Sequence, residues 1–296
     1  MSILPPSVDS HLASIDIKST AQPQGIKSLA VLSTLVLPAF TVQLESVSNW
    51  GANPANIQMN IYLPDHLATS PPVILAMHPC GGNAQQYFQM TRLPSYADPL
   101  GFSLIYPQTP HFSNCWDCYD AKTLLRNGGG DSTGLAAMVN HTLATYDGDR
   151  ARVFVTDSSG AVMTSVMAST YPDLFAAGSA FSSVPTGFWK GAPRATPFSA
   201  GVSCSMDRKT LSGREWGTLA HAGYPGYNST RPRMQIWHGQ PQWADVFRVQ
   251  WTQNSTDTPL EGYTEMVYGN GSRLLGYRAQ GVGHIAPFQE ESVLRF

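Results

Sequence analysis

Charged side chains are scarce in this sequence. Lys, Arg, Asp and Glu make up 13% of its 296 residues, about half of the roughly 25% usual for soluble domains. The net charge of −2 provides neither a basic field for nucleic acid nor an acidic tail. We therefore expect no nucleic-acid partner. Small polar and aromatic residues replace the missing charge, a composition that fits a loop-rich extracellular enzyme.

The N-terminal part lacks an apolar run long enough to span a bilayer. Residues 29–40 are apolar and follow Lys27, which gives the length of a signal-peptide core; a buried strand or helix is the alternative. The residues before this run are rich in Ser, Pro and Gln and aperiodic. Residues 1–43 are thus predicted to be a disordered extension with a signal segment, and residues 44–296 to be one domain without a membrane partner.

Cysteine is also rare and does not follow a zinc-binding spacing. The chain has Cys80, Cys115, Cys118 and Cys204, which form no paired CxxC sets, so we expect no metal. Cys115 and Cys118 form a single CxxC, but no thioredoxin-like pattern surrounds it. Disulfides, and therefore an oxidising compartment, are the preferred interpretation.

Four N-glycosylation sequons agree with that compartment. They begin at Asn140, Asn228, Asn254 and Asn270. Because chance alone supplies one or two in a chain rich in Ser and Thr, they support secretion only mildly. The expected location is extracellular.

Alternating strand and helix patterns predict the fold class. Apolar or alternating runs indicate strands at 57–63, 73–77, 102–106, 152–156, 177–181, 234–238 and 274–279. Helical patterns occupy 131–146, with Asp131 or Ser132 as the N-cap, and 161–170. Such alternation favours an α/β fold with a mainly parallel sheet and helices on both faces.

A candidate nucleophile follows the strand at 152–156. The turn Thr156-Asp157-Ser158-Ser159-Gly160 lies between a strand and a helix, the setting of a nucleophile elbow in an α/β-hydrolase. Ser158 would be the nucleophile, and the N–H of Ser159 would face the oxyanion at the helix N-terminus. The alternative is that Ser158 and Ser159 only cap the helix.

A serine nucleophile needs a base and an orienting carboxylate, which follow it in this fold in the order acid, then histidine. Of eight histidines, His221, His238 and His284 come after the turn. His284 lies on a glycine-rich loop after the last predicted strand, where the base belongs. Asp245 is the only acid in the segment 239–245, which makes it the candidate orienting carboxylate.

Several spaced motifs fit one family. They are His78-Pro-Cys80-Gly81, Asn114-Cys-Trp-Asp117, Asn127-Gly-Gly-Gly-Asp131-Ser132, Tyr171-Pro-Asp-Leu-Phe-Ala-Ala-Gly178, Met234-Gln-Ile-Trp-His-Gly239 and Gly281-Val-Gly-His284. The chain resembles the fungal acetylxylan esterases of carbohydrate esterase family 1, whose relatives include feruloyl esterases.

This resemblance implies a secreted α/β-hydrolase without a cofactor that removes acetyl groups from acetylated xylan. It implies Ser158 as nucleophile, His284 as base and a disulfide between Cys80 and Cys115. Backbone N–H groups of Ser159 and of the Cys80–Gly81 turn would form the oxyanion hole.

The chain departs from the family pattern at three places. The elbow is one residue short, so Ser158 is the nucleophile counted from the helix and Ser159 counted from the strand; we favour Ser158. Gln242 stands where the family has its orienting aspartate. A cysteine expected near Phe188 is absent, which leaves Cys204 unpaired or paired with Cys118.

Two other functions stay open at this point. A degenerate esterase fold could bind polysaccharide without turnover, as the short elbow and Gln242 suggest. A feruloyl esterase would keep the chemistry and change the acyl group.

Overall fold

The computed structural model describes residues 44–158, 162–182, 184–190, 211–238, 242–283 and 285–296. The predicted signal segment lies outside the described residues. So do Ser159, Gly160, Cys204 and His284.

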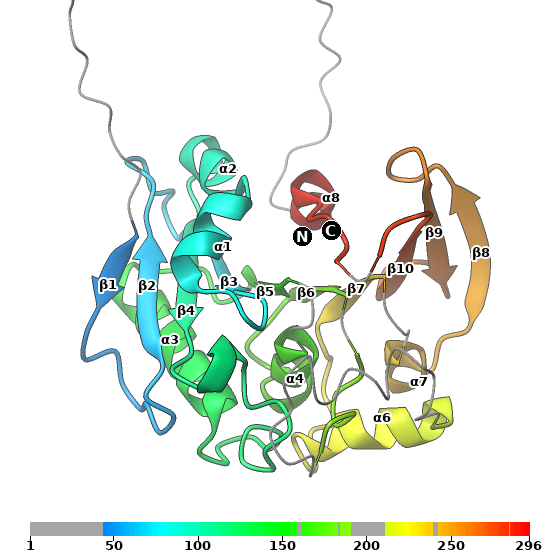
Figure 1. Cartoon of the computed structure of the whole chain (residues 1–296), viewed down its shortest axis with the longest axis horizontal. Helices are drawn as coiled ribbons and strands as arrows, with labels where there is room; N and C mark the ends of the chain where they lie inside the picture. The colour runs from blue at the N-terminus through cyan, green and yellow to red at the C-terminus, as the bar shows by residue number, and fades with distance from the viewer. Residues whose placement is uncertain (1–43, 159–161, 183, 191–210, 239–241, 284) are drawn as a thin grey trace, which may run out of the picture. The chain divides into compact units, whose positions relative to one another are not determined.

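The described residues form a ten-stranded sheet (Figure 1). Its order is β1-β2-β4-β3-β5-β6-β7-β10-β9-β8. The six strands from β4 to β10 in that order are parallel, and the strands at both ends are antiparallel. The strands are β1 (Glu45–Val47), β2 (Gln58–Tyr62), β3 (Val73–Met77), β4 (Ser103–Gln108), β5 (Val153–Asp157), β6 (Ala177–Phe181), β7 (Arg233–Trp237), β8 (Trp251–Thr256), β9 (Tyr263–Tyr268) and β10 (Leu274–Ala279).

Helices cover both faces of the sheet. In Figure 1, α1, α2 and α8 lie above it and α3, α4, α6 and α7 lie below. Their bounds are α1 (Ala84–Met90), α2 (Leu93–Leu100), α3 (Asp131–Thr145), α4 (Met163–Thr170), α6 (Gly213–Ala222), α7 (Trp243–Phe247) and α8 (Glu290–Arg295), with a 3₁₀ turn η1 at Phe112–Asn114. The predicted α/β class with a mainly parallel sheet is confirmed.

Strand β3 shows why a continuous apolar run forms the centre of this sheet. Successive side chains of a strand point to opposite faces. Val73, Leu75 and Met77 pack in the core formed with α3 and α4, whereas Ile74 and Ala76 pack in the core formed with α1 and α2. Both faces are therefore dry, as expected for a parallel sheet between helix layers.

The predicted cap of the helix at 131–146 is wrong. Gly130 is the N-cap, and Asp131 and Ser132 are the first two residues of α3. Their side chains have other partners: the Asp131 carboxylate binds His111 and the backbone of Asp117, and the Ser132 hydroxyl donates to a backbone carbonyl.

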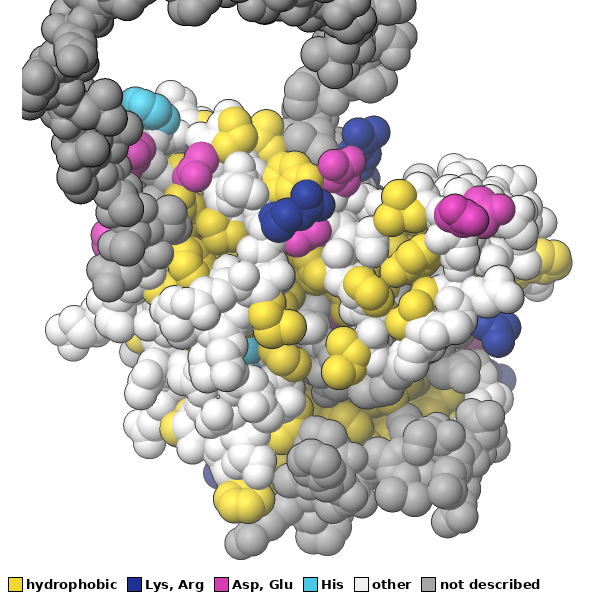
Figure 2. Space-filling view, turned by 45° about the horizontal axis from the view of Figure 1, so that its top comes forward, with side chains coloured by type: hydrophobic (Ala, Val, Ile, Leu, Met, Phe, Trp, Pro, Cys, Tyr) yellow, Lys and Arg dark blue, Asp and Glu magenta, His cyan; other side chains and the backbone are white. Residues whose placement is uncertain are grey.

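The face of the molecule shown in Figure 2 carries few charged side chains among its described residues. In Figure 2, hydrophobic side chains stand in small groups among uncharged polar atoms, and charged side chains occur singly or in small groups. Among the described residues, no helix combines the length and the apolar character that crossing a bilayer requires.

Candidate active site

The turn after β5 lies at the carboxyl edge of the parallel sheet. Met77 of β3 pairs with Asp157 of β5, so the segments that follow these two strands start side by side, about 4.8 Å apart. Ser158 follows Asp157 directly and is 8% exposed. The predicted nucleophile therefore lies beside the turn that holds Cys80.

Asp157, the last residue of β5, connects this strand to its neighbours. Its side chain is fully buried. Oδ2 accepts the backbone N–H of Thr164 in the first turn of α4 at 2.9 Å, and Oδ1 accepts the backbone N–H of Phe181 at the end of β6 at 3.2 Å. One carboxyl thus joins β5, β6 and α4 around Ser158. Burial raises the pKa of Asp157 well above its usual value, and the two backbone donors oppose that rise.

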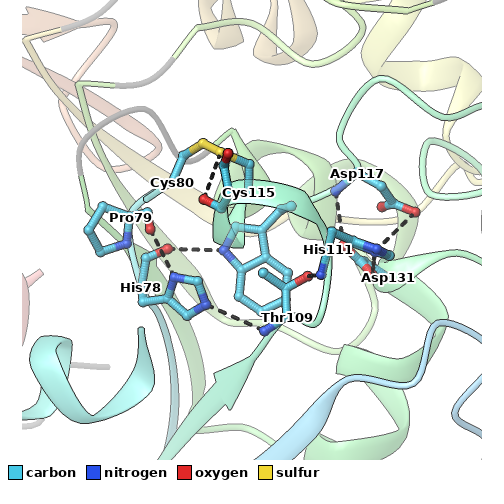
Figure 3. The surroundings of a disulfide bond; sticks show 10 residues. His78, Pro79, Cys80, Thr109, His111, Cys115, Asp117 and Asp131 are labelled. Carbon is cyan, nitrogen blue, oxygen red and sulfur yellow. Dashed lines mark hydrogen bonds and ion pairs between the residues drawn. A yellow bond between two sulfur atoms is a disulfide. The ribbon is translucent and has the colours of Figure 1, made fainter. Parts of the chain in front are cut away.

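The predicted disulfide between Cys80 and Cys115 is present (Figure 3). The two Cα atoms lie 4.2 Å apart and the residues are 35 positions apart in sequence. The bond connects the turn after β3 to the segment that follows η1. Because Cys115 pairs with Cys80, the Cys115–Cys118 CxxC is not a redox pair.

The two predicted donors of the Cys80–Gly81 turn differ. The Gly81 N–H donates to the carbonyl of Asn114 at 3.3 Å. The Cys80 N–H has no hydrogen-bond partner among the described residues. Gly81 has φ +84°, a conformation that glycine adopts without a steric cost. Of the two groups, the Cys80 N–H is the one free to bind an oxyanion.

His78 supports this turn from below. It is fully buried; its Nδ1 lies 2.8 Å from the Pro79 carbonyl, and its Nε2 accepts the Thr109 N–H at 3.4 Å. These contacts fit the neutral ring protonated on Nδ1, and burial lowers the pKa of His78 to about 4. The Trp116 indole donates to the His78 carbonyl at 3.0 Å. His78 thus acts as a structural residue beneath the oxyanion turn.

A buried polar cluster next to the disulfide was not predicted from the sequence. His111 Nε2 lies 2.8 Å from Asp131 Oδ1, and Asp131 Oδ2 accepts the N–H of Asp117 at 2.9 Å (Figure 3). Thr123 donates a short hydrogen bond to Asp117. The residues stand 6 to 20 positions apart in sequence, so only the fold reveals them.

The electrostatics of this cluster follow from its burial. Burial, and then repulsion from Asp131, raise the pKa of Asp117 to about 7. The hydrogen bond to Asp131 raises the pKa of His111. One ligand atom from each of His111, Asp117 and Asp131 falls within 4.8 Å of the others, but the carboxylate oxygens already accept hydrogen bonds within the cluster. These hydrogen bonds attach the segment around Cys115 to Asp131 in the first turn of α3.

The loop that carries His284 is attached to the carboxyl end of β6. Ser182 follows β6, and its Oγ accepts the backbone N–H of Ala286 at 2.9 Å. Ala286 packs in a core cluster in which the rings of Phe181, Trp237 and Tyr277 stack. The neighbours of His284 are therefore held at the same edge of the sheet as Ser158, and the contacts of His284 itself lie outside the described residues.

Gln242, which the family resemblance places at the orienting-acid position, forms hydrogen bonds with backbone groups of Thr186 and Trp216. It is 4% exposed. Its Oε1 accepts the Thr186 N–H at 2.8 Å, and its Nε2 donates to the carbonyls of Trp216 at 3.0 Å and Thr186 at 3.4 Å. An amide satisfies both kinds of partner, which a carboxylate cannot do.

Asp245 lies on α7 and is exposed. Its carboxylate lies against Gly213, the first residue of α6, and its Cβ lies near Gly217 one turn further on. The side chain thus reaches the N-terminus of α6, where a negative charge is favourable. Pairing of Asp245 with His284 stays a prediction.

The structure also describes the other residues named from the sequence. Cys118 is a buried free thiol, so it does not pair with Cys204. His221 lies in the last turn of α6. His238 has φ +54°, and its buried Nδ1 has no hydrogen-bond partner within the described part of the chain. The four sequon asparagines are exposed.

Several known proteins are similar to this chain in sequence and in fold. Residues 57–199 match the family model "Esterase PHB depolymerase". Feruloyl esterase B of Neurospora crassa is 45% identical over 91% of this chain and 97% of its own length. Acetylxylan esterase A of Emericella nidulans is 39% identical over 86% of this chain and 88% of its own length.

A solved acetyl xylan esterase from Aspergillus awamori has a TM-score of 0.79 and 35% identity, and the match covers 84% of this chain and 97% of that one. The residues matched by the family model, 57–199, include β5, the strand that precedes Ser158. The chain belongs to the fungal family of acetylxylan and feruloyl esterases, carboxylic ester hydrolases with the α/β-hydrolase fold.

Proposed function

We propose that this protein is a secreted serine esterase that removes acetyl groups from acetylated xylan. The observation that carries the proposal is the convergence of three segments at one sheet edge: Ser158 after β5, the disulfide-linked Cys80 turn after β3, and the loop tied to Ser182 after β6.

In the proposed reaction, His284 takes the proton of Ser158 Oγ as the oxygen attacks the ester carbonyl. The oxyanion accepts hydrogen bonds from the N–H groups of Cys80 and Ser159. His284 then gives its proton to the departing sugar hydroxyl. Water attacks the acyl-enzyme by the same route, and acetate leaves. No cofactor enters these steps.

The Cys80 N–H, which has no partner within the described part of the chain, supports this proposal, because an oxyanion hole needs donors that are not already satisfied. The disulfide and the His78–Trp116 contact hold that N–H in place before substrate arrives. Pre-oriented donors of this kind are worth about 2.7–4 kcal/mol of transition-state stabilisation each.

Asp245 is the candidate for the orienting carboxylate in this proposal, as the acid of the segment after β7. Because its carboxylate also lies against the N-terminus of α6, this role is tested by mutagenesis of Asp245.

A feruloyl ester is the second candidate substrate. Two observations favour it: the relatives with 42–45% identity are feruloyl esterases, whereas the acetylxylan esterases have 39–40%, and exposed apolar side chains stand on two segments of the site. Phe112 precedes the disulfide and is 77% exposed, and Ile285 follows His284 and is 66% exposed. A feruloyl ring would gain apolar contacts that acetate does not need.

Initial rates on acetylated xylan and on methyl ferulate, for the wild type and Ser158→Ala, test the proposal. We expect acetate release from xylan that Ser158→Ala abolishes. Phe112→Ala should raise KM for methyl ferulate while leaving the acetyl reaction unchanged. If Ser158→Ala keeps its hydrolytic activity and Ser159→Ala loses it, the nucleophile is Ser159.

A protein that binds polysaccharide without turnover is the remaining alternative, supported by Gln242 in place of an acid and by the short elbow. Xylan retention by Ser158→Ala and the wild type alike, with no product from either, would establish it.

Secretion is part of the proposal. The disulfide and the exposed sequons support it, because disulfides persist in oxidising compartments. Recovery of Met1 in protein collected from the culture medium would contradict removal of the predicted N-terminal segment.

A further inference from the structure

Trp251 is an exposed indole bonded to a sequon. It lies on β8 and is 56% exposed. Its Nε1–H donates to Oδ1 of Asn254 at 2.7 Å. Asn254 begins the sequon Asn-Ser-Thr that ends at Thr256. This ring adds little to the core, yet its orientation is fixed by the sequon amide.

A β-bulge brings the two side chains to one face of the strand. Residues three apart on a regular strand point to opposite faces. Here the pairing shifts between Trp251 and Gln253, so Trp251 pairs with Tyr268 and Asn254 pairs with Met266. Tyr268 and Met266 are two apart on β9 and share a face, and so do their partners.

Thr256 completes the row. It pairs with Thr264 of β9, two positions beyond Met266, so it lies on the same face as Asn254 and Trp251. All three side chains are exposed. The hydroxyl and the amide that a sequon requires thus stand in line with the indole.

The hydrogen bond leaves the reactive atom of Asn254 free. Glycans attach to the amide nitrogen, and the indole binds the amide oxygen, so the contact persists after modification. Two of the other three sequons have different hydrogen bonds. Asn140 is inside α3 and its Nδ2 donates to the Ala136 carbonyl, and the oxygen of Asn270 accepts from its own sequon residue Ser272.

We propose that Asn254 carries an N-linked glycan whose first sugar stacks on the indole of Trp251. The C–H groups on one face of a pyranose carry partial positive charge, which the negative face of an aromatic ring attracts. The proposal requires passage through the secretory pathway and is independent of the esterase chemistry.

The glycan would also cover the free edge of the sheet. Strand β8 is the outermost strand beyond β9 (Figure 1), and an uncovered edge offers unpaired N–H and C=O groups to other chains. A hydrated sugar above this edge would keep the protein from pairing edge to edge.

Peptide mapping of the full chain secreted from a yeast host, with and without enzymatic removal of N-glycans, tests the modification. We expect Asn254 to be occupied and Trp251→Ala to lower occupancy several-fold. Leu260→Ala is the matched control, since it removes another exposed apolar side chain (53% exposed) from the same hairpin and should leave occupancy unchanged. An unmodified Asn254 in the wild type overturns the proposal.

A double-mutant cycle tests the stacking. Thr256→Ala removes the sequon but keeps Trp251, and it should lower Tm by about 2–4 °C, the shift for roughly 1 kcal/mol in a domain of this size. Trp251→Ala should then cost much less Tm in the Thr256→Ala background than alone. Equal losses in both backgrounds, or equal losses in protein made in bacteria without glycans, would show that the indole does not bind the sugar.

Discussion

Replacement of Asp157 is the perturbation that most directly tests how the short elbow is held. Asp157→Ala leaves the buried N–H groups of Thr164 and Phe181 without their acceptors. A buried donor that loses its partner costs about 1–3 kcal/mol, so two cost about 2–6 kcal/mol. Since domains have about 5–15 kcal/mol in total, we expect a large decrease in the free energy of unfolding, measured by urea titration.

The pH dependence gives an independent signature of the same carboxyl. In the unfolded chain an aspartate ionises near pH 4, whereas burial holds the pKa of folded Asp157 well above its usual value. As pH rises past about 4, the unfolded chain releases its proton first, and stability falls until the folded carboxyl also ionises. Asp157→Asn removes this decline.

The comparison with Asp157→Asn is therefore made across pH. The asparagine side chain keeps one acceptor oxygen and places its NH₂ group against a backbone N–H. The Asp157→Asn variant should therefore be less stable than the wild type by about 1–3 kcal/mol near pH 4. The deficit should shrink toward pH 8. If it stays constant across that interval, Asp157 is ionised in the fold and the argument from burial is refuted.

Three further substitutions test the surroundings of the site. The double variant Cys80→Ser/Cys115→Ser should lower the free energy of unfolding by about 3–4 kcal/mol, the value for a loop of 35 residues. It should also lower kcat while changing KM little; an unchanged kcat would show that the disulfide does not position the oxyanion turn. Gln242→Asp should lower the free energy of unfolding by about 1–3 kcal/mol, because it leaves the Thr186 carbonyl without its side-chain donor and sets a carboxylate oxygen against the Trp216 carbonyl; a variant as stable as the wild type would contradict this. If Asp245 orients His284 as proposed, Asp245→Asn should lower kcat/KM by up to roughly 10⁴, whereas a change of less than about tenfold would show that its carboxylate serves only its contact with the N-terminus of α6.

The sequence predicts the centre of the sheet well because central parallel strands are buried on both faces. The predicted strands at 73–77, 177–181 and 274–279 coincide with β3, β6 and β10. Strands β8 and β9 were not predicted, because a strand that is not buried on both faces lacks a continuous apolar run. Strand β8 is a polar edge strand that is exposed along its length, so it shows no apolar alternation.

In the candidate site, too, the residues that the sequence predicts are those whose role depends on their immediate neighbours in the chain. Ser158 was predictable from its immediate neighbours, because a strand, a serine turn and a helix follow one another in sequence. The roles of Asp157 and Gln242 depend on partners far along the chain: Phe181 is 24 positions from Asp157, and Thr186 is 56 positions from Gln242. From the sequence alone, Asp157 looks like a residue misplaced in the elbow and Gln242 like a lost acid.

The structure supplies a physical reason for both departures. The Asp157 carboxyl accepts the backbone N–H of Thr164 and so ties the N-terminal turn of α4 to the end of β5. At position 242 the two carbonyls require a donor and one N–H requires an acceptor, which only an amide side chain provides. Asp157 and Gln242 therefore each satisfy backbone groups of this chain. In the proposed mechanism the orienting carboxylate is then Asp245, and the kcat of Asp245→Asn beside that of Ser158→Ala measures how much the chemistry depends on it.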